Sequence, residues 1–391
     1  MSAFTDIKTK LTERQAAGLY RRRRVVDSAQ SRELIVDGKT LLNFCSNDYL
    51  GLASDPRVRN AFQQGANDWG VGSGASHLVN GHTRAHEELE EALAEFTGRP
   101  RALVFSSGFA ANLGTIAGLL KRSDHIFEDR LNHASLLDGG LISRAHFKRF
   151  PHRDYDQLRE QLSDIYTESR KLIVSDGVFS MDGTSCDVRT MSDIAATHDA
   201  WLMIDEAHSL GVIGEQGRGL VHQTGATTDD VQVLIGTLGK AFGTQGGFVA
   251  GTDELIETLI QNARTYIYST AIPSAIAVAT ITSLHIAARE EWRREKLAAL
   301  IQRFRAGAEQ LGLEMLDSDT PIQPILLGSS ERATEMSQLL EDQGMMITPI
   351  RPPTVKRGSS RLRITLTADH TEDDIDQLLS ALEITASNLA R

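Results

Sequence analysis

The feature that most constrains this fold is a regular alternation between about residues 100 and 250. Short apolar runs with the length of buried strands alternate there with longer amphipathic stretches, such as 110–120, 155–165 and 191–198. This alternation is typical of a mainly parallel sheet flanked by helices, so the predicted fold class is α/β. The predicted strands are 101–105, 125–128, 171–174, 201–204, 231–235 and 247–250. Functional side chains of such sheets gather where the carboxyl ends of strands meet loops.

The sequence on either side of this region predicts an N-terminal arm and a second, smaller domain. The arm carries the basic run Arg21 to Arg24, which we expect on a helix, and a strand pair around 33–42. After a helical run from about residue 273, strands and helices indicate an α+β domain, whose last helix has apolar residues at helical spacing between 375 and 382. The predicted organisation is an arm at 1–50, a large domain at 51–275 and a C-terminal α+β domain at 276–391.

Charge and composition narrow the classes of function. The net charge of −11 argues against nucleic acid as a main partner, because phosphate binding needs a basic surface. No apolar run reaches the roughly 20 residues of a membrane-spanning helix, and the N-terminus lacks the pattern of a signal peptide. The two cysteines, Cys45 and Cys186, are far apart and have no metal-ligand spacing. We therefore expect a reduced, cytoplasmic enzyme with neither nucleic acid nor membrane as a partner.

One lysine stands in an unusual setting, directly after a predicted strand and between glycines. Lys240 is the fifth residue of Gly-Thr-Leu-Gly-Lys-Ala-Phe-Gly, which runs from 236 to 243. Most lysines are solvated surface residues, and that is the alternative interpretation. A lysine packed among small residues at a strand end is partly desolvated, which lowers its pKa and frees the amine to form a Schiff base.

An acidic residue ends another predicted strand, in Ile-Asp-Glu-Ala-His at 204–208. Burial of Asp205 at the end of an apolar run costs free energy unless the carboxylate meets a cation. A protonated pyridine nitrogen is such a cation; a helix cap or a structural ion pair is the alternative. His208 follows three residues later, where it would reach an oxygen on the same ring or serve as a satisfied core histidine.

The turn Ser-Ser-Gly-Phe-Ala-Ala-Asn at 106–112 joins a predicted strand to a predicted helix. Gly108 lets the turn close, and free N–H groups at a helix start bind phosphate. Most strand–helix junctions contain a glycine, so this motif alone is weak evidence. His133, in Leu-Asn-His-Ala-Ser at 131–135, begins the next helix and would either stack on an aromatic ring or be structural.

These motifs become specific when they are taken in order, with Ser180 between His133 and Asp205. Ser-Gly-Phe-Ala-Ala-Asn, Asn-His-Ala-Ser, Asp-Gly-Val-Phe-Ser-Met-Asp-Gly, Asp-Glu-Ala-His and Gly-Thr-Leu-Gly-Lys-Ala-Phe-Gly resemble the α-oxoamine synthases, a family of fold-type-I enzymes that use pyridoxal 5′-phosphate (PLP). The resemblance covers nearly the whole chain. It implies the fold-type-I transferase architecture, PLP as the cofactor and a homodimer with shared active sites.

The resemblance implies a role for individual residues. Lys240 matches the Schiff-base lysine, and Asp205 matches the partner of the pyridine nitrogen. His208 and Ser180 match groups around the phenolic oxygen, while His133 matches the histidine stacked on the ring. The implied catalytic residues are therefore Lys240, His133, Asp205 and His208. The implied phosphate-binding residues are Ser107, Gly108, Phe109 and Thr237, together with Ser269 and Thr270 from the second subunit.

The resemblance also implies where the substrates bind. Asn47 and Arg363 match the residues that hold the amino-acid carboxylate, and the planar fork of an arginine suits that role. The alternative for Arg363 is an exposed strand residue. Arg351 and Thr354 lie in Ile-Arg-Pro-Pro-Thr-Val at 350–355, where Arg351 is a candidate contact for the acyl substrate. Arg21 matches an arginine near the thioester, or lies on a solvated helix face.

The stretch at 350–355 is most similar to the family member that joins L-alanine to a pimeloyl thioester, with loss of carbon dioxide, in biotin synthesis. The pimeloyl group would arrive on coenzyme A or on acyl carrier protein. His77 stands where relatives that use glycine or serine usually carry arginine, which weakens those alternatives; its own role stays open. The remaining alternative is a sister synthase, namely glycine C-acetyltransferase or 5-aminolevulinate synthase.

Three other classes of protein fit the sequence less well. A nucleotide-driven motor would share Asp-Glu-Ala-His, but it also needs G-x-x-x-x-G-K-[ST], which is absent around Lys240. A metal enzyme is suggested by the i, i+4 spacing of His82 and His86, but the H-E-x-x-H pattern and a third ligand are missing, so no catalytic metal is predicted. A non-catalytic PLP-fold protein would be expected to lose Lys240 or Asp205.

Overall fold

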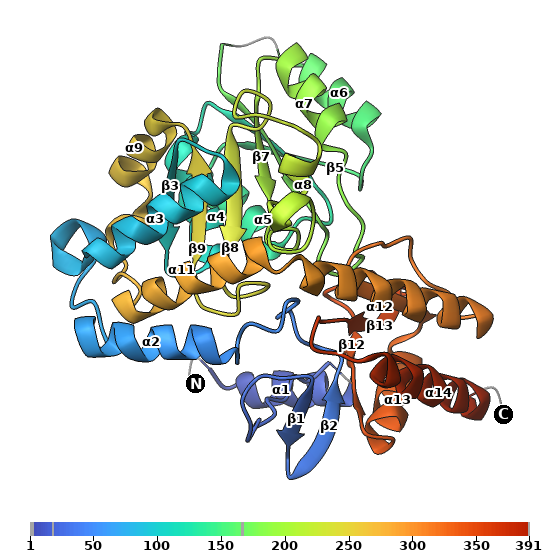
Figure 1. The fold of residues 1–391 in the computed structure, drawn as a ribbon. Coiled ribbons are helices and arrows are strands. Elements are labelled where there is room, and N and C mark those ends of the chain that lie inside the picture. The colour runs from blue at the N-terminus through green and yellow to red at the C-terminus, as the bar shows by residue number, and fades with distance from the viewer. Residues whose placement is uncertain (1–3, 18, 166–167, 390–391) are drawn as a thin grey trace. The chain divides into compact units, whose positions relative to one another are not determined.

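The computed structural model describes residues 4–17, 19–165 and 168–389. Its contacts divide the chain into two compact units. Figure 1 draws the fold with the ribbon coloured by residue number. The larger unit comprises Asn47–Ser180 and Thr184–Leu297, and the smaller comprises Met1–Ser46, Met181–Gly183 and Ala298–Arg391. This division differs from the predicted boundary at residue 275, because the first helix after it, α11 (Ser274–Arg289), packs on helices of the larger unit.

A mainly parallel sheet organises the larger unit. Among the described residues it has seven strands in the order β3-β9-β8-β7-β6-β4-β5, and only the pairs made by β9 are antiparallel. This confirms the predicted α/β class. The strands are β3 (Arg101–Phe105), β4 (His125–Asp129), β5 (His146–Phe150), β6 (Lys171–Asp176), β7 (Trp201–Asp205), β8 (Val233–Thr237) and β9 (Gly247–Gly251). The sequence did not predict β5, because this edge strand buries only Phe150 fully and carries charged residues.

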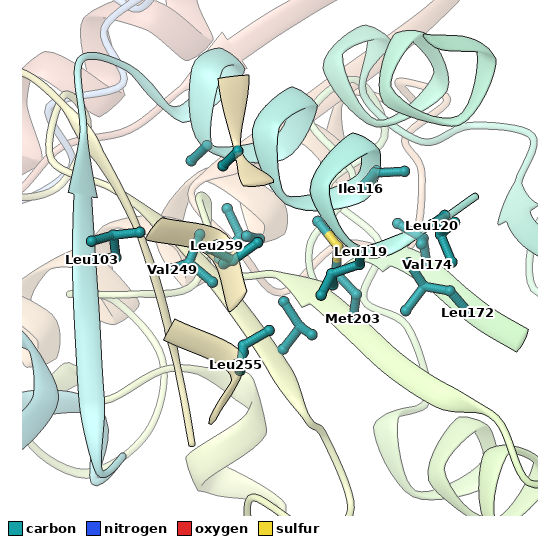
Figure 2. Packing of buried hydrophobic residues seen from close by; sticks show 14 of the residues in the cluster. Leu103, Ile116, Leu119, Leu120, Leu172, Val174, Met203, Val249, Leu255 and Leu259 are labelled. Carbon is teal, nitrogen blue, oxygen red and sulfur yellow. The ribbon is translucent and has the colours of Figure 1, made fainter. Parts of the chain in front are cut away.

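Helices cover the sheet and bury its apolar side chains. The central helix α4 packs across β3, β9 and β8. Figure 2 shows Ile116 and Leu119 of this helix, and Leu120 directly after it, among buried residues of the strands, such as Met203 and Val249. The helices of this unit are α2 (Pro56–Trp69), α3 (Arg84–Thr97), α4 (Gly108–Leu119), α5 (Ala134–Ser143), α6 (Tyr155–Ser163), α7 (Val188–Thr197), α8 (Leu220–Gln223), α9 (Asp253–Asn262), α10 (Arg264–Ile267) and α11, with a π-helical turn at His77–Gly81 and a 3₁₀ turn at Glu215–Gly217.

Close packing explains why α11 belongs to the larger unit. It lies along α2 and α3, and a Cβ added to Gly65 of α2 would come within 2.9 Å of the Ala275 backbone. Only glycine allows the two helices to approach this closely. The next helix, α12 (Glu291–Gln310), begins beyond a break at Glu290, whose ψ of 73° is not helical.

The smaller unit contains two small sheets and several helices. One joins β1 (Glu33–Val36), β2 (Lys39–Asn43) and β11 (Met345–Met346); the other joins β10 (Ile322–Gly328), β13 (Ser360–Thr365) and β12 (Thr348–Ile350). The predicted strand at 346–350 is thus two strands in different sheets. The helices are α1 (Ile7–Ala16), α13 (Ser330–Asp342) and α14 (Glu372–Leu389), together with the later part of α12. In the part of the chain that the structure describes, no helix is both long and apolar enough to span a membrane.

The expectation of a helix at Arg21 to Arg24 is wrong. The chain has neither helix nor strand there, and it continues into a bridge between Val26 and Val36 beside the β1–β2 hairpin. The β-branched side chain of Val26 favours the strand-like backbone of this bridge. The predicted strand pair itself is confirmed as β1 and β2, whose turn at Asp37 and Gly38 has positive φ at both residues.

Replacement of Glu128 by glutamine should reduce the loss of stability between pH 6 and pH 8. Glu128 of β4 is fully buried, and burial raises its pKa to about 8. The folded state therefore keeps a proton that the unfolded state, with a pKa near 4.3, has released. Stability falls as pH rises through this interval, by about 2 kcal/mol for this group alone. Urea unfolding at pH 6 and pH 8 should show this decrease in the free energy of unfolding in the native protein but not in Glu128→Gln. Equal decreases in the two proteins would contradict the prediction.

Candidate active site

The carboxyl ends of the central strands bring the predicted functional residues together. Asp176 and Asp205 end β6 and β7 and lie opposite each other in the strand register. Lys240 follows the end of the next strand, β8, by three residues. This edge of a parallel sheet is where ligands bind in such folds.

A chain of hydrogen bonds runs from the lysine to the start of the larger unit. Nζ of Lys240 lies 2.7 Å from Nε2 of His208, and Nδ1 of His208 lies 2.7 Å from the hydroxyl of Tyr49. That hydroxyl donates to Oδ1 of Asn47 at 3.2 Å. The two ring nitrogens of His208 thus connect the hydroxyl of Tyr49 to the amine of Lys240. His208 therefore orients the amine of Lys240.

A second network holds the side chain of Asp205. Its two oxygens accept from the N–H of Ala207 at 2.9 Å and from Nδ2 of Asn112 at 2.7 Å. Asn112 also donates to the hydroxyl of Ser135, which lies 2.7 Å from Nδ1 of His133. The buried Asp205 is thus fixed by two N–H donors, an environment suited to a carboxylate anion.

Asp176 adds a second buried carboxyl group beside Asp205. Burial and then the charge of Asp205 raise the pKa of Asp176 well above its usual range, so it holds a proton more readily than an ordinary aspartate. It also accepts from the N–H of His133 at 2.7 Å, which fixes the start of α5. Burial lowers the pKa of His133, with opposing effects from Asp205 and Lys240. A neutral imidazole is better suited to stacking on an aromatic ring than a charged imidazolium is.

The turn before α4 offers N–H groups to an anion. Ser107 caps the helix by accepting from the N–H of Ala110, whereas the earlier N–H groups of Gly108 and Phe109 have no carbonyl in the helix to bond. An added Cβ on Gly108 would lie 3.5 Å from the side chain of Thr237, so this hydroxyl borders the turn. Gly247 also packs on Gly108, since its added Cβ would lie only 2.5 Å from the Gly108 backbone. The two glycines therefore allow the turn and β9 to approach this closely.

The other predicted cofactor residues lie on loops. Ser180 is on the loop after β6, which closes on itself through a bridge between Val178 and Ser185. Ser269 and Thr270 precede α11, and Thr270 forms an isolated bridge with Ser76. Thr270 is exposed and Ser269 is partly exposed within one chain. Their predicted contact with a second subunit stays a prediction.

Four predicted substrate residues belong to the smaller unit. Arg363 is 7% exposed in β13, the central strand of its sheet, so the alternative of an exposed strand arginine is wrong. Arg361, on the same face, is paired with Asp182 and donates to the carbonyl of Met181 at 3.2 Å. Arg351 donates to the hydroxyl of Thr334 at 3.3 Å, Thr354 is exposed, and Arg21 is exposed in the N-terminal arm.

The structure adds residues that sequence reasoning missed. Tyr49 orients His208, Asn112 and Ser135 connect Asp205 to His133, and Asp176 ends the strand beside Asp205. Three of these lie within or beside motifs already noted, but their side-chain directions depend on tertiary contacts. Asp176 could have been predicted from the sequence, because it is an acidic residue that follows an apolar run, as Asp205 does.

This donor set fits PLP. The amine of Lys240 suits its aldehyde, the buried carboxylate of Asp205 suits its pyridinium nitrogen, and the N–H groups before α4 suit its phosphate. Without a cation nearby, a buried carboxylate such as Asp205 is costly, and the ring nitrogen supplies that cation.

Comparison with known proteins identifies relatives along nearly the whole chain. The model of the aminotransferase class I and II family matches residues 39–382. The 8-amino-7-oxononanoate synthase of Nitrosococcus oceani is 57% identical over 95% of this chain and 99% of its own. A solved structure of the enzyme of that name from Francisella tularensis is 32% identical, with a TM-score of 0.78 over 90% of this chain and 99% of its own. A structure of a serine palmitoyltransferase with PLP is 29% identical, with a TM-score of 0.94 over 100% of this chain and 98% of its own.

Proposed function

Because the chain belongs to the class I and II aminotransferase family and, within it, to the 8-amino-7-oxononanoate synthases, we propose that it joins L-alanine to a pimeloyl thioester. The products are 8-amino-7-oxononanoate, carbon dioxide and the free thiol, and the reaction serves biotin synthesis. The observation that carries this proposal is the convergence of Lys240, the buried Asp205 and the open helix start of α4 at one edge of the sheet. This arrangement supplies what PLP chemistry on an amino acid requires.

PLP, when bound, withdraws electrons from the Cα of an attached amino acid and so stabilises negative charge there. Asp205 keeps the proton on the ring nitrogen, and Asn112 and the Ala207 N–H keep Asp205 in place. Lys240 removes the Cα proton of alanine as the general base. His208 holds the lysine amine in position through its 2.7 Å hydrogen bond. The alanine Cα would then bond to the thioester carbonyl carbon as the thiolate leaves. Loss of the alanine carboxylate as carbon dioxide would leave an electron pair on Cα, and Lys240 would return to Cα the proton that it had removed.

Substrate binding is assigned by the same proposal. Asn47 and Arg363 hold the alanine carboxylate, and the buried position of Arg363 supports a role for its guanidinium beyond solubility. Arg351 and Thr354 contact the acyl substrate, and Arg21 lies near the thioester. The exposed side chain of Arg21 is accessible to a large acyl carrier, whether coenzyme A or a carrier protein.

A homodimer with shared sites is also part of the proposal. Several large apolar side chains of the larger unit are exposed in the single chain, including Val71 at 87%, Val79 at 75% and Tyr268 at 69%. Apolar residues exposed to this extent support a protein interface, and Tyr268 immediately precedes Ser269 and Thr270. Light scattering should give twice the mass of one chain; the mass of a single chain would contradict shared sites.

The amino-acid substrate can be tested by the visible absorption of the purified protein with PLP. L-Alanine, glycine and L-serine are added separately, and each addition is followed by pimeloyl-CoA. A saturable spectral change with L-alanine, and a further change only after the thioester, is the expected result. A preference for glycine or L-serine would move the enzyme to a sister synthase, and a protein that takes up no PLP would overturn the proposal.

Replacement of Tyr49 by phenylalanine should lower kcat by about 3- to 10-fold, the value of one neutral hydrogen bond. The change removes the hydroxyl that is hydrogen-bonded to Nδ1 of His208, so the imidazole no longer holds Lys240 in one orientation. Tyr155→Phe is the matched control, because it also removes a hydrogen-bonded tyrosine hydroxyl, which accepts from the N–H of Asp187 at 2.7 Å, far along the chain from Lys240. Steady-state kinetics should separate the two variants; equal rates would contradict the role of Tyr49.

A further inference from the structure

A cluster of histidine and glutamate side chains lies outside the residues assigned to the reaction. It is formed by the π-helical turn His77–Gly81, the residues just after it and the first turns of α3. These side chains border a cavity of about 270 Å³, which Tyr266 and Arg101 also line. The family resemblance assigns no role to His77, and no step of the proposed reaction uses this cluster.

Three of these side chains converge on one point. A ring nitrogen of His82 and one carboxylate oxygen each from Glu87 and Glu90 all lie within 4.8 Å of one another. Glu87 and Glu90 are three residues apart in α3, which places them on the same face of the helix, one turn apart. His82 reaches them from the segment before the helix, and its Nε2 lies 3.0 Å from Oε2 of Glu87. One imidazole and two carboxylates therefore face a common space.

The ring of His82 is oriented by a second histidine. Nδ1 of His82 lies 2.9 Å from Nδ1 of His77, so one nitrogen donates and the other accepts. His77 is buried and stacks on Tyr266 at a centroid distance of 4.8 Å and an angle of 15°. Metal-bound histidines commonly have such a partner on their other nitrogen.

His86 takes no part in the convergence, although its spacing from His82 first drew attention. Nε2 of His86 donates to the carbonyl of Ile272 at 2.7 Å, and Nδ1 accepts from the N–H of Thr83 at 3.1 Å. With both ring nitrogens used, it has no lone pair for a metal ion. The ligand set is thus not the i, i+4 histidine pair of a metalloprotease.

The charges around the cluster are compatible with a cation. Arg101 lines the same cavity, but its guanidinium donates to Glu257 at 2.7 Å and lies 3.7 Å from Asp253. Glu90 accepts from the N–H of Val104 at 2.8 Å, and burial raises its pKa to about 8. A metal ion at this point would compensate the buried charge of the Glu90 carboxylate.

We propose that His82, Glu87 and Glu90 bind one zinc-class divalent cation per subunit, with water completing the coordination and His77 orienting His82. A mixed set of imidazole and carboxylate ligands suits Zn²⁺, whereas Mg²⁺ and Ca²⁺ prefer oxygen ligands alone. The site is separate from the residues that hold PLP in the proposed function, and the proposal does not depend on that function.

Direct zinc binding tests the site. The enzyme with PLP is freed of metal with a chelating resin and titrated with zinc chloride at pH 7 against a colorimetric zinc indicator. One equivalent per subunit should bind, and Glu87→Gln and His82→Ala should each weaken binding by at least about tenfold, as loss of metal-site groups does. Glu87 is exposed, so its variant should fold normally.

A matched control separates this site from general binding to surface histidines. His146 stacks on His125 at 4.8 Å on β4 and β5, where no such carboxylate pair converges among the described residues. His146→Ala should leave zinc binding unchanged. Absence of saturable zinc binding would overturn the proposal, as would equal affinities of the native protein, Glu87→Gln and His82→Ala. Displacement of zinc by equimolar Mg²⁺ would also contradict it.

Discussion

Replacement of Lys240 by alanine is expected to lower turnover by at least about a thousandfold while the fold stays intact. The amine of Lys240 is the general base in the proposed reaction, and a positioned acid–base group contributes about 10²- to 10⁴-fold by itself. Its loss also removes the covalent partner of PLP. Steady-state rates of carbon dioxide release measure the effect, and circular dichroism checks the fold.

The control for this variant is Lys171→Ala. Lys171 is also partly buried and begins β6, but its Nζ donates to the carbonyl of His198 rather than to a side chain of the site. Its replacement should leave turnover within a few-fold of the native rate. More than about one hundredth of native turnover in Lys240→Ala would contradict the assignment of Lys240 as the base.

Replacement of Asp205 by asparagine should lower kcat by at least about a hundredfold, which is the scale of losing one preorganised electrostatic group. An amide cannot keep the proton on a pyridine nitrogen as a carboxylate can. Asn112 could rotate its unbonded Oδ1 toward the new amide, but its Nδ2 would then lose Ser135. We therefore expect the kcat loss with a smaller change in KM, and an altered visible absorption of bound PLP.

Asp187→Asn is the matched control for Asp205→Asn. Asp187 caps α7 by accepting from the N–H of Thr190 at 3.0 Å, so it has a structural role at a helix start. Its asparagine variant keeps an accepting oxygen and should retain native kcat. If Asp205→Asn stayed within tenfold of the native kcat, Asp205 would not be the partner of the ring nitrogen.

Much of the fold could be predicted because local patterns and tertiary packing agree in the larger unit. Strands such as β7 are continuous apolar runs that end in an acidic residue. This pattern can be recognised from the sequence without knowledge of the tertiary contacts. β5 was missed because an edge strand buries little and so needs few apolar residues. The split of 346–350 into β11 and β12 depends on two different partner strands, which no local pattern encodes.

The site residues that could be predicted are those whose residue type is rare at their position in the sequence pattern. Lys240 and Asp205 stand out because burial of a charged residue near the end of an apolar strand costs free energy unless the charge has a partner. Tyr49 did not stand out, since a buried tyrosine near the N-terminal arm is ordinary until its hydroxyl is seen 2.7 Å from His208. The convergence of His82, Glu87 and Glu90 depends on the π-helical turn at His77–Gly81, which the sequence did not predict.

The most direct test of the proposed reaction follows the carboxyl carbon of alanine. The enzyme with PLP is given L-alanine labelled with ¹³C in the carboxyl group, together with pimeloyl-CoA. We predict labelled carbon dioxide, free thiol and unlabelled 8-amino-7-oxononanoate in equal amounts by mass spectrometry, and none of them when the thioester is omitted. Carbon dioxide without the thioester, or a product that keeps the label, would contradict decarboxylative condensation.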